Sequence, residues 1–396
     1  MSEVRVNNLT NENNTGGPTI SGITTYSGRH FFVPPVGDTT ERPSDCEPGS
    51  LRFNTDTLHL EYFRGNTIGW TEIEAELASD ILGGGSGSNE GLGVRGIYFG
   101  GTGAPSTDRI DFFTISTLGN AEDFGDAAVS AANRGGVASR TRGVVMAGQP
   151  GASPYYMNSI EFITISSTGN GTDFGDSTQL AGSEADAASN QIRGVKGCGG
   201  GASGGFLNVL EYITIAQTGN ALDFGDLVHP KANTCQSTMN TVRGLFAGGY
   251  TGPSNPTNNA HNIIEFVTIM TTGNTTDFGD LTQKTRRAGA VCNSTRSVFA
   301  NGLTPSNTNV MSFVTTASTG NAIDFGDTLT QNNIKSHGSS SPTRGVFCGG
   351  YVPGSPGVTN AMEFIEIATT GNGKDFGDLV ATDGAGAAIS NGHGGL

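Results

Sequence analysis

Apolar and polar residues follow a strand-like pattern in short segments that recur along most of the chain. In the clearest example, Ile160–Ile165, polar Glu and Thr are set among β-branched and aromatic residues. Such patterning is typical of strands. Each segment is followed by Gly-Asn, which tolerates positive φ, and then by a short segment centred on Phe. This order predicts a hairpin between a third and a fourth strand of a repeated unit.

Two independent markers define that unit. The tetrapeptide Asp-Phe-Gly-Asp (DFGD) occurs six times, 47 to 54 residues apart, with its aromatic residue at Phe124, Phe174, Phe224, Phe278, Phe325 and Phe376. An Arg, followed by Gly in five units and by Ser297 in the fifth, opens the predicted second strand at Arg95, Arg142, Arg193, Arg243, Arg296 and Arg344. A strand-rich unit near fifty residues resembles the four-stranded blade of kelch-type propellers.

The two ends of the repeat region are expected to share one unit between them. The region opens at Val94 directly on an Arg-Gly strand, whereas Asp383–Leu396 resembles the weakly marked first strand of a unit, such as Ala288–Ser294. We therefore expect the last residues to complete the first blade, which would leave no exposed sheet edge. The prediction is an all-β fold: a six-bladed β-propeller with four-stranded blades, closed by the C-terminal strand.

Three zones organise the chain. Residues 1–82 form a β-rich N-terminal region, 83–93 read as a Gly/Ser linker, and 94–396 carry the repeats. Within the first zone, residues 49–73 predict a three-stranded meander, with turns at 54–57 and 64–66.

Composition narrows the classes of partner. The formal net charge is −15, and there is no basic run, no long apolar run and no charged-then-apolar leader at Met1. Such a chain is expected to be soluble, without a cleaved signal, and to avoid nucleic acid and membrane insertion. Five widely spaced Cys without a CxxC pair favour reduced, buried thiols.

The repeated residues invite functional interpretations. DFGD resembles the magnesium-binding motif of protein kinases, but that motif occurs once per kinase domain and needs partner loops that are absent here. Calcium at each turn is an alternative. We favour a structural role, with Phe in the core, Gly allowing close backbone approach and Asp capping turns. The recurrent Arg is expected to pair with a DFGD carboxylate rather than to bind an anion on the axis.

The predicted third strand also carries a recurrent acidic residue, replaced by Ser312 in the fifth unit: Asp111, Glu161, Glu211, Glu265 and Glu363. We expect these carboxylates to be solvated or paired with Arg.

Catalysis finds little support in the sequence. The six His do not recur at ligand spacing, and HExxH and GxSxG are absent. The single Trp, Trp70, lies outside the repeats, unlike the Trp of sialidase Asp-boxes. We expect no enzyme activity, no cofactor and no metal site.

Variable loops follow each second strand and should emerge on one face. Aromatic rings among Asn, Ser and Thr suit sugar or protein surfaces, so the candidate ligand-binding residues are Tyr155, Tyr156, Phe206, Tyr250, His261 and Tyr351.

The N-terminal meander resembles short β-modules of tail-fibre and other virion proteins of tailed bacteriophages. The segment His30–Thr39 and the repeats TTGNxxDFGDL and RGVFxGG look like structural proteins of marine cyanobacterial phages. This resemblance implies a virion protein, assembled in the host cytoplasm. Residues 1–82 would attach to other virion proteins, as a homotrimer in the manner of such fibres, and the propeller would recognise a host-surface glycan or protein. Two alternatives remain open, a capsid-decoration protein without a receptor role and a glycan-degrading depolymerase.

Overall fold

The computed structural model contains two compact parts, Met1–Ala75, here called the N-terminal domain, and Glu76–Leu396, here called the repeat domain. The predicted linker 83–93 lies outside the described residues. The structure describes residues 34–57, 59–73, 94–101, 108–151, 153, 155–183, 186–197, 199–201, 205–230, 236–251, 260–303, 305–332, 338–354 and 357–396.

The N-terminal domain holds one sheet of order β1-β2-β3-β4. The predicted meander is present as β2 (Leu51–Asn54), β3 (His59–Phe63) and β4 (Trp70–Ile73), paired antiparallel in sequence. A two-residue strand, β1 (Val36–Gly37), adds a parallel edge to β2 and leads into the 3-10 turn η1 (Thr39–Glu41). The pattern did not predict β1, because two residues are too few to show alternation.

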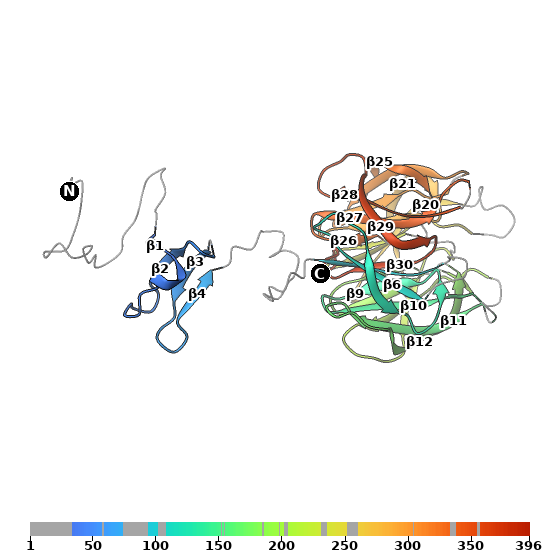
Figure 1. Cartoon of the computed structure of the whole chain (residues 1–396). Helices are drawn as coiled ribbons and strands as arrows, with labels where there is room; N and C mark the ends of the chain where they lie inside the picture. The colour runs from blue at the N-terminus through green and yellow to red at the C-terminus, as the bar shows by residue number, and fades with distance from the viewer. Residues whose placement is uncertain are drawn as a thin grey trace, which may run out of the picture. The chain divides into compact units, whose positions relative to one another are not determined.

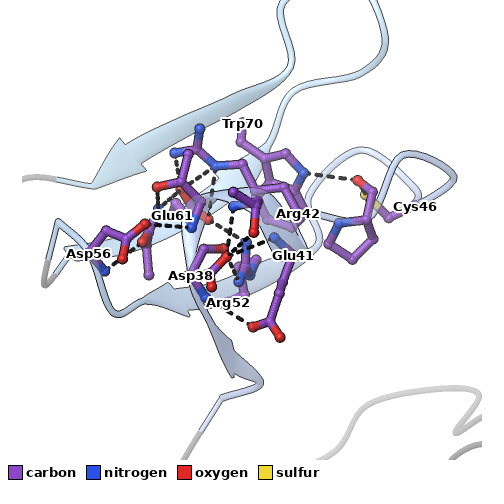
Figure 2. A network of polar contacts seen from close by, with 12 residues as sticks. Asp38, Glu41, Arg42, Cys46, Arg52, Asp56, Glu61 and Trp70 are labelled. Carbon is purple, nitrogen blue, oxygen red and sulfur yellow. Dashed lines mark hydrogen bonds and ion pairs between the residues drawn. The ribbon is translucent and has the colours of Figure 1, made fainter.

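A buried carboxylate organises this sheet (Figure 2). Glu61, fully buried on β3, accepts hydrogen bonds from Arg42 at 2.7 Å and from Arg52 at 3.1 Å. Burial alone would raise the pKa of Glu61, but Arg42 and Asn54 outweigh it and hold the pKa below its usual value. Trp70 donates from Nε1 to the carbonyl oxygen of Pro43 at 3.1 Å. The network ties the loop between η1 and β2 to the sheet.

The repeat domain is built of antiparallel sheets, one for each repeat unit (Figure 1). The first strands are β9 (Gly135–Ala138), β13 (Asp186–Ser189), β18 (Gln236–Met239), β22 (Gly289–Cys292), β26 (Ser339–Ser340) and β30 (Ala387–Ser390). The second strands are β5 (Arg95–Phe99), β10 (Arg142–Pro150), β14 (Arg193–Gly197), β19 (Arg243–Ala247), β23 (Arg296–Ala300) and β27 (Arg344–Tyr351). The third strands are β6 (Arg109–Thr114), β11 (Met157–Thr164), β16 (Val209–Thr214), β20 (His261–Thr268), β24 (Thr308–Thr315) and β28 (Val358–Glu366). The fourth strands are β7 (Glu122–Asp126), β12 (Thr172–Ser183), β17 (Leu222–Asp226), β21 (Thr276–Thr285), β25 (Ile323–Asn332) and β29 (Lys374–Asp383).

Five of these sheets have the expected four strands, and the C-terminal β30 pairs with β5 of the first unit, Ile389 opposite Ile97. The second unit departs from the expectation, because its sheet has six strands. Two short strands extend it: β8 (Ala131–Ala132) pairs with the end of β10, and β15 (Gly200–Gly201), from the third unit, pairs with β12.

DFGD and the Gly-Asn turn form the seam between neighbouring sheets. The Phe side chains of DFGD are buried, at 2% to 3% exposure, as predicted. In the fourth unit, Gly279 has φ +144°, and a Cβ there would lie 2.5 Å from the carbonyl oxygen of Gly320 in the next unit. The amide of Gly320 donates to the carbonyl of Phe278, and the amide of Asp280 donates to the Asn321 side chain at 3.0 Å.

The same seam recurs between the sixth and the first units. The amide of Gly119 donates to the Phe376 carbonyl at 3.0 Å, and the amide of Asp378 donates to the Asn120 side chain at 3.1 Å. The expectation that the DFGD aspartates cap turns with their side chains is therefore wrong. The capping side chain is the Asn of the next unit, and Asp takes part through its backbone amide and carbonyl.

The recurrent Arg also acts across the seam, but its expected pairing with a DFGD carboxylate is wrong. Arg142 lies with its guanidinium carbon 4.3 Å from the ring centroid of Phe162 in its own unit and donates to the Ile215 carbonyl of the next unit at 3.0 Å. Each of the six Arg residues makes the same two contacts, and Arg344 donates to Ile115 of the first unit. A planar guanidinium can stack on a ring and donate at its edge at once, so these two contacts hold the Arg without a DFGD carboxylate. Arg344 adds an ion pair with Glu366 at 3.1 Å.

We expect Arg142→Met to lower the free energy of unfolding by about 1–2 kcal/mol, because it removes one cation–π contact and one hydrogen bond while keeping an apolar stem. Denaturant unfolding measures the change. Arg140→Met, at an exposed position two residues earlier, is the matched control and should change stability by less than about 0.5 kcal/mol. Equal effects of the two variants would contradict the assigned role.

Serine hydroxyls join the first strands of neighbouring sheets. Ser189 donates to the Ala138 carbonyl at 3.2 Å, and Ser339 donates to the Ile389 carbonyl at 2.8 Å. Ser390 donates to the Ser340 carbonyl at 2.6 Å. The first strands therefore contact one another from sheet to sheet, including β26 with β30 and β30 with β9.

The last residues lie against the first strands of several units. His393 is buried, with Nε2 2.9 Å from the Ala138 carbonyl. A Cβ on Gly394 would lie 2.3 Å from the Asn293 carbonyl oxygen, and one on Gly395 would lie 2.0 Å from that of Ser189. Glycine is therefore required at both positions by the closeness of the backbone.

Three cysteines among the described residues are free thiols, of which Cys292 and Cys348 are buried. Burial raises the pKa of both thiols, which keeps them protonated and unreactive near neutral pH. The prediction of buried, reduced thiols is confirmed for these two, whereas Cys46 is only partly buried. Cys198 and Cys235 lie outside the described residues.

Candidate functional loop arc

The variable loops lie at one end of the sheets. Each second strand begins at its recurrent Arg and ends at the variable loop. Because the strands are antiparallel, the Gly-Asn turns lie at the Arg end and the variable loops at the other. Val94, where the described chain enters the repeat domain, precedes Arg95 and so lies at the Arg end.

Two of the predicted aromatic residues meet between the third and fourth units. The rings of Phe206 and Tyr250 pack edge to face with centroids 5.3 Å apart. Phe206 forms an isolated bridge with Gly200, and Tyr250 forms one with Ala260. The guanidinium of Arg286, between the fourth and fifth units, lies 5.3 Å from the Tyr250 ring. The loops of neighbouring units are therefore packed together.

His261 lies beside this pair, at the start of β20. Its Nε2 is 3.0 Å from the Thr251 hydroxyl, and its ring stacks on that of His229 with centroids 6.2 Å apart. His229 is in turn 3.3 Å from the buried carboxylate of Glu265. Two imidazoles and a tyrosine thus border one stretch of the loop end.

The contacts continue through the fifth unit to the sixth. Arg286 bridges to Leu303, Leu303 bridges to Asn307, and the Asn307 side chain donates to the Tyr351 carbonyl at 3.2 Å. We call the residues of this chain of contacts, together with the neighbouring His261, the loop arc: Phe206, Tyr250, His261, Arg286, Leu303, Asn307 and Tyr351. Four of the six predicted binding residues belong to it.

The other two predicted residues stand apart in the second unit. Tyr155 is 55% exposed and Tyr156 is half-buried, both in the segment before β11. The sequence did not single out Arg286, Leu303 or Asn307. Arg286 lies in a connection between units, whereas the variable loops that the sequence marks lie within units. The aliphatic Leu303 and the amide Asn307 carried no signal of their own.

The acidic residues of the third strands are buried, so the expectation of a solvated face is wrong, whereas the alternative of pairing with Arg holds for Asp111 and Glu161. All five are at most 6% exposed. Each accepts a hydrogen bond from an amide that follows DFGD in the preceding unit, as in Glu161, which accepts from the Ala128 amide at 2.7 Å. Their role is to cap backbone between sheets.

The cationic side chains that pair with these carboxylates come from different positions of the repeat in different units. Arg134 pairs with Glu161 at 3.0 Å, Lys196 pairs with Glu211, and Arg109 pairs with Asp111 at 2.7 Å. None of these cations is the recurrent Arg. Burial raises the pKa of Asp111 despite Arg109, whereas Lys196 lowers that of Glu211 against the effect of burial.

The described residues also bear on metal sites and on membrane spans. Within these residues, no three His, Cys, Asp or Glu side chains gather as metal ligands would. Nor does any helix described in the structure have the length and apolar character to cross a membrane.

Comparisons with known proteins identify the fold. No protein-family model matches this chain, and no curated protein matches its sequence. Among solved structures, the chain is similar to the structure of YjhT, with a TM-score of 0.58 and 8% sequence identity, over 71% of this chain and 94% of that one. YjhT has a kelch-like β-propeller fold. At this identity the likeness shows the fold alone, which agrees with the predicted β-propeller.

Proposed function

We propose that the repeat domain is a closed six-bladed propeller. The seams between the sixth and first units support this, because they use the same contacts as the other five. These contacts are the Gly119 amide to the Phe376 carbonyl and Arg344 to the Ile115 carbonyl. Ser339 adds a hydrogen bond to the Ile389 carbonyl at this seam. Strand β30 completes the first blade in this arrangement.

We further propose that the protein is a structural protein of a phage virion, a tail-fibre or appendage protein of a marine cyanobacterial phage. Its propeller recognises a glycan or protein on the host surface, without enzymatic activity. The N-terminal region through residue 82 attaches to other virion proteins, as a trimer in the manner of fibres. The observation that carries the proposal is the loop arc. Its aromatic and polar residues border the end of the sheets opposite Val94, where the chain enters from the attachment region.

Binding of the labelled full chain to a panel of marine cyanobacterial cells tests this function. We expect the double variant Tyr250→Ala/Tyr351→Ala, which changes both tyrosines of the loop arc, to weaken binding by at least about tenfold, because tyrosines at the centre of an interface carry much of its energy. Ile192→Ala/Val242→Ala is the matched control, since these side chains are 53% and 55% exposed at the opposite end.

Equal loss in the control and loop variants would contradict recognition through the loops. Binding to no strain, together with normal assembly into particles, would favour a decoration protein. Release of reducing ends from host polysaccharide, lost on changing a carboxylate at the loop end, would favour a depolymerase.

A further inference from the structure

The sheet of the N-terminal domain buries its polar face. Along a strand, successive side chains lie on opposite faces, and residues paired across two strands share a face. Arg52 pairs with Glu61, and both are buried, at 4% and 0% exposure. The segment that follows η1 covers this face, because Arg42 donates to Glu61 and the Pro43 carbonyl accepts from Trp70 (Figure 2).

Apolar side chains lie on the opposite face of the same sheet. Phe53 on β2 pairs with Val36 on β1 and with Leu60 on β3. One row further along, Leu51 pairs with Tyr62. Val36 and Leu51 are 57% and 47% exposed, and the other three side chains are half-buried. We call these five residues the apolar face. Neighbouring apolar side chains left partly in water on one surface mark an interaction site.

A domain as small as this one needs support beyond its own core. Below about 70–80 residues a single core supplies little stability, and small domains are commonly held by disulfides, metals or association. The N-terminal domain spans Met1–Ala75 and contains one cysteine, Cys46, so it has no internal disulfide. Its buried layer is built around the ion pairs of Glu61, which are a weak source of net stability. Covering the apolar face with a second polypeptide would add the apolar layer that the sheet lacks.

Charge favours a second copy of this chain as the occupant of the apolar face. The chain carries a net charge of −15, so two copies repel each other wherever their contact surfaces carry that charge. The apolar face is neutral, and the charged strand residues Arg52, Glu61 and Glu72 lie on the opposite face. Two N-terminal domains can therefore meet with these carboxylates directed away from the contact. A charged partner would find no opposite charge on the apolar face to bind.

We propose that the apolar face is the surface through which the N-terminal domains of separate copies of this chain associate. Each copy contributes its own apolar face, and burial of the five side chains against those of the other copies drives the association. The surface follows from the sheet itself. The number of copies, three, rests on the proposed function, in which the attachment region is a trimer.

Light scattering of the full chain during size-exclusion chromatography tests this surface. We expect the parent chain to have three times the 40.6 kDa mass of one copy. Leu60→Glu should reduce the mass to that of one copy, because it places a charge at the centre of the contact. Leu51→Glu, at a more exposed position of the same face, is a second variant with the same expected result. Ile68→Glu is the matched control and should keep the parent mass, since Ile68 is 58% exposed in the turn between β3 and β4.

Trp70 is the single tryptophan of the chain, so its emission reports whether the N-terminal domain of each variant remains folded. A parent chain with the mass of one copy would overturn the proposal and leave residues 1–33 or another protein as the occupant. The parent mass retained in both Leu60→Glu and Leu51→Glu would overturn it as well. A mass of two copies, lost in these variants, would support the surface and contradict the trimer of the proposed function. Binding to host cells through the loop arc is measured separately and does not depend on these results.

Discussion

Deleting residues 387–396 should lower the free energy of unfolding of the repeat domain by at least about 5 kcal/mol. Ile389 is 4% exposed and packs against Gly136 and Gly143, and loss of one such buried side chain typically costs about 2–5 kcal/mol. The deletion also removes the ladder to β5 and the Ser390 contact with Ser340. Denaturant unfolding followed by circular dichroism measures the loss.

The shortened chain should also associate, because β5 becomes an uncovered strand edge. Size-exclusion chromatography would detect this association. A synthetic peptide of residues 384–396, added in excess, should restore both stability and the monomeric elution position, whereas a scrambled peptide should not. An unchanged denaturation midpoint in the deleted chain would show that β30 is not needed to hold the first sheet.

His393 should make the protein less stable as the pH falls from about 6.5 to about 4. The Gly395 amide donates to Nδ1 at 3.1 Å, so the hydrogen resides on Nε2, which donates to the Ala138 carbonyl. Protonation of Nδ1 would break the Gly395 bond and bury a cation, and burial accordingly lowers the pKa to about 4.

The direction in which folding stability changes with pH follows from this pKa. The unfolded chain binds a proton at His393 near pH 6.5, whereas the folded chain does so only near pH 4. Folding stability is therefore fully present above pH 6.5 and is lost progressively down to pH 4, by roughly 3 kcal/mol in total.

Unfolding free energies at pH 7.5 and pH 4.5, in parent and His393→Gln chains, isolate this contribution. Glutamine can donate to Ala138 but does not titrate, so the difference between the two chains should shrink or reverse at the lower pH. The comparison is needed because Asp186, whose pKa burial raises well above its usual value, contributes with the opposite sign. A constant difference between the chains at both pH values would exclude the titration of His393.

The sequence predicted the sheets well because their determinants are local and repeated. Phe278 and its equivalents mark fourth strands, and the Gly-Asn turns mark the hairpins, so strand order within a unit can be predicted from one unit and checked against five. Short strands such as β8 and β15 could not be predicted, because two-residue segments rich in Ala and Gly have no periodicity.

The sequence was least informative about partners across the seams. Every unit contains both a recurrent Arg, such as Arg142, and an acidic DFGD motif. Their regular spacing favoured a salt bridge between the two. Its actual partners are a ring and a carbonyl oxygen, and a backbone carbonyl leaves no trace in the choice of residue. For the loop arc, aromatic composition identified Phe206 and Tyr250, but their contact depends on how two neighbouring loops fold toward each other.

The seam between units carries a consequence for how such a protein diversifies. Gly, Asn and Arg meet the backbone of the adjoining unit, so one unit accepts another as a neighbour with little regard to its loop. Whole units can be duplicated, exchanged or reordered in the gene while the joints still fit. A lineage under pressure to change its exposed surface can thus recombine intact modules instead of waiting for single substitutions.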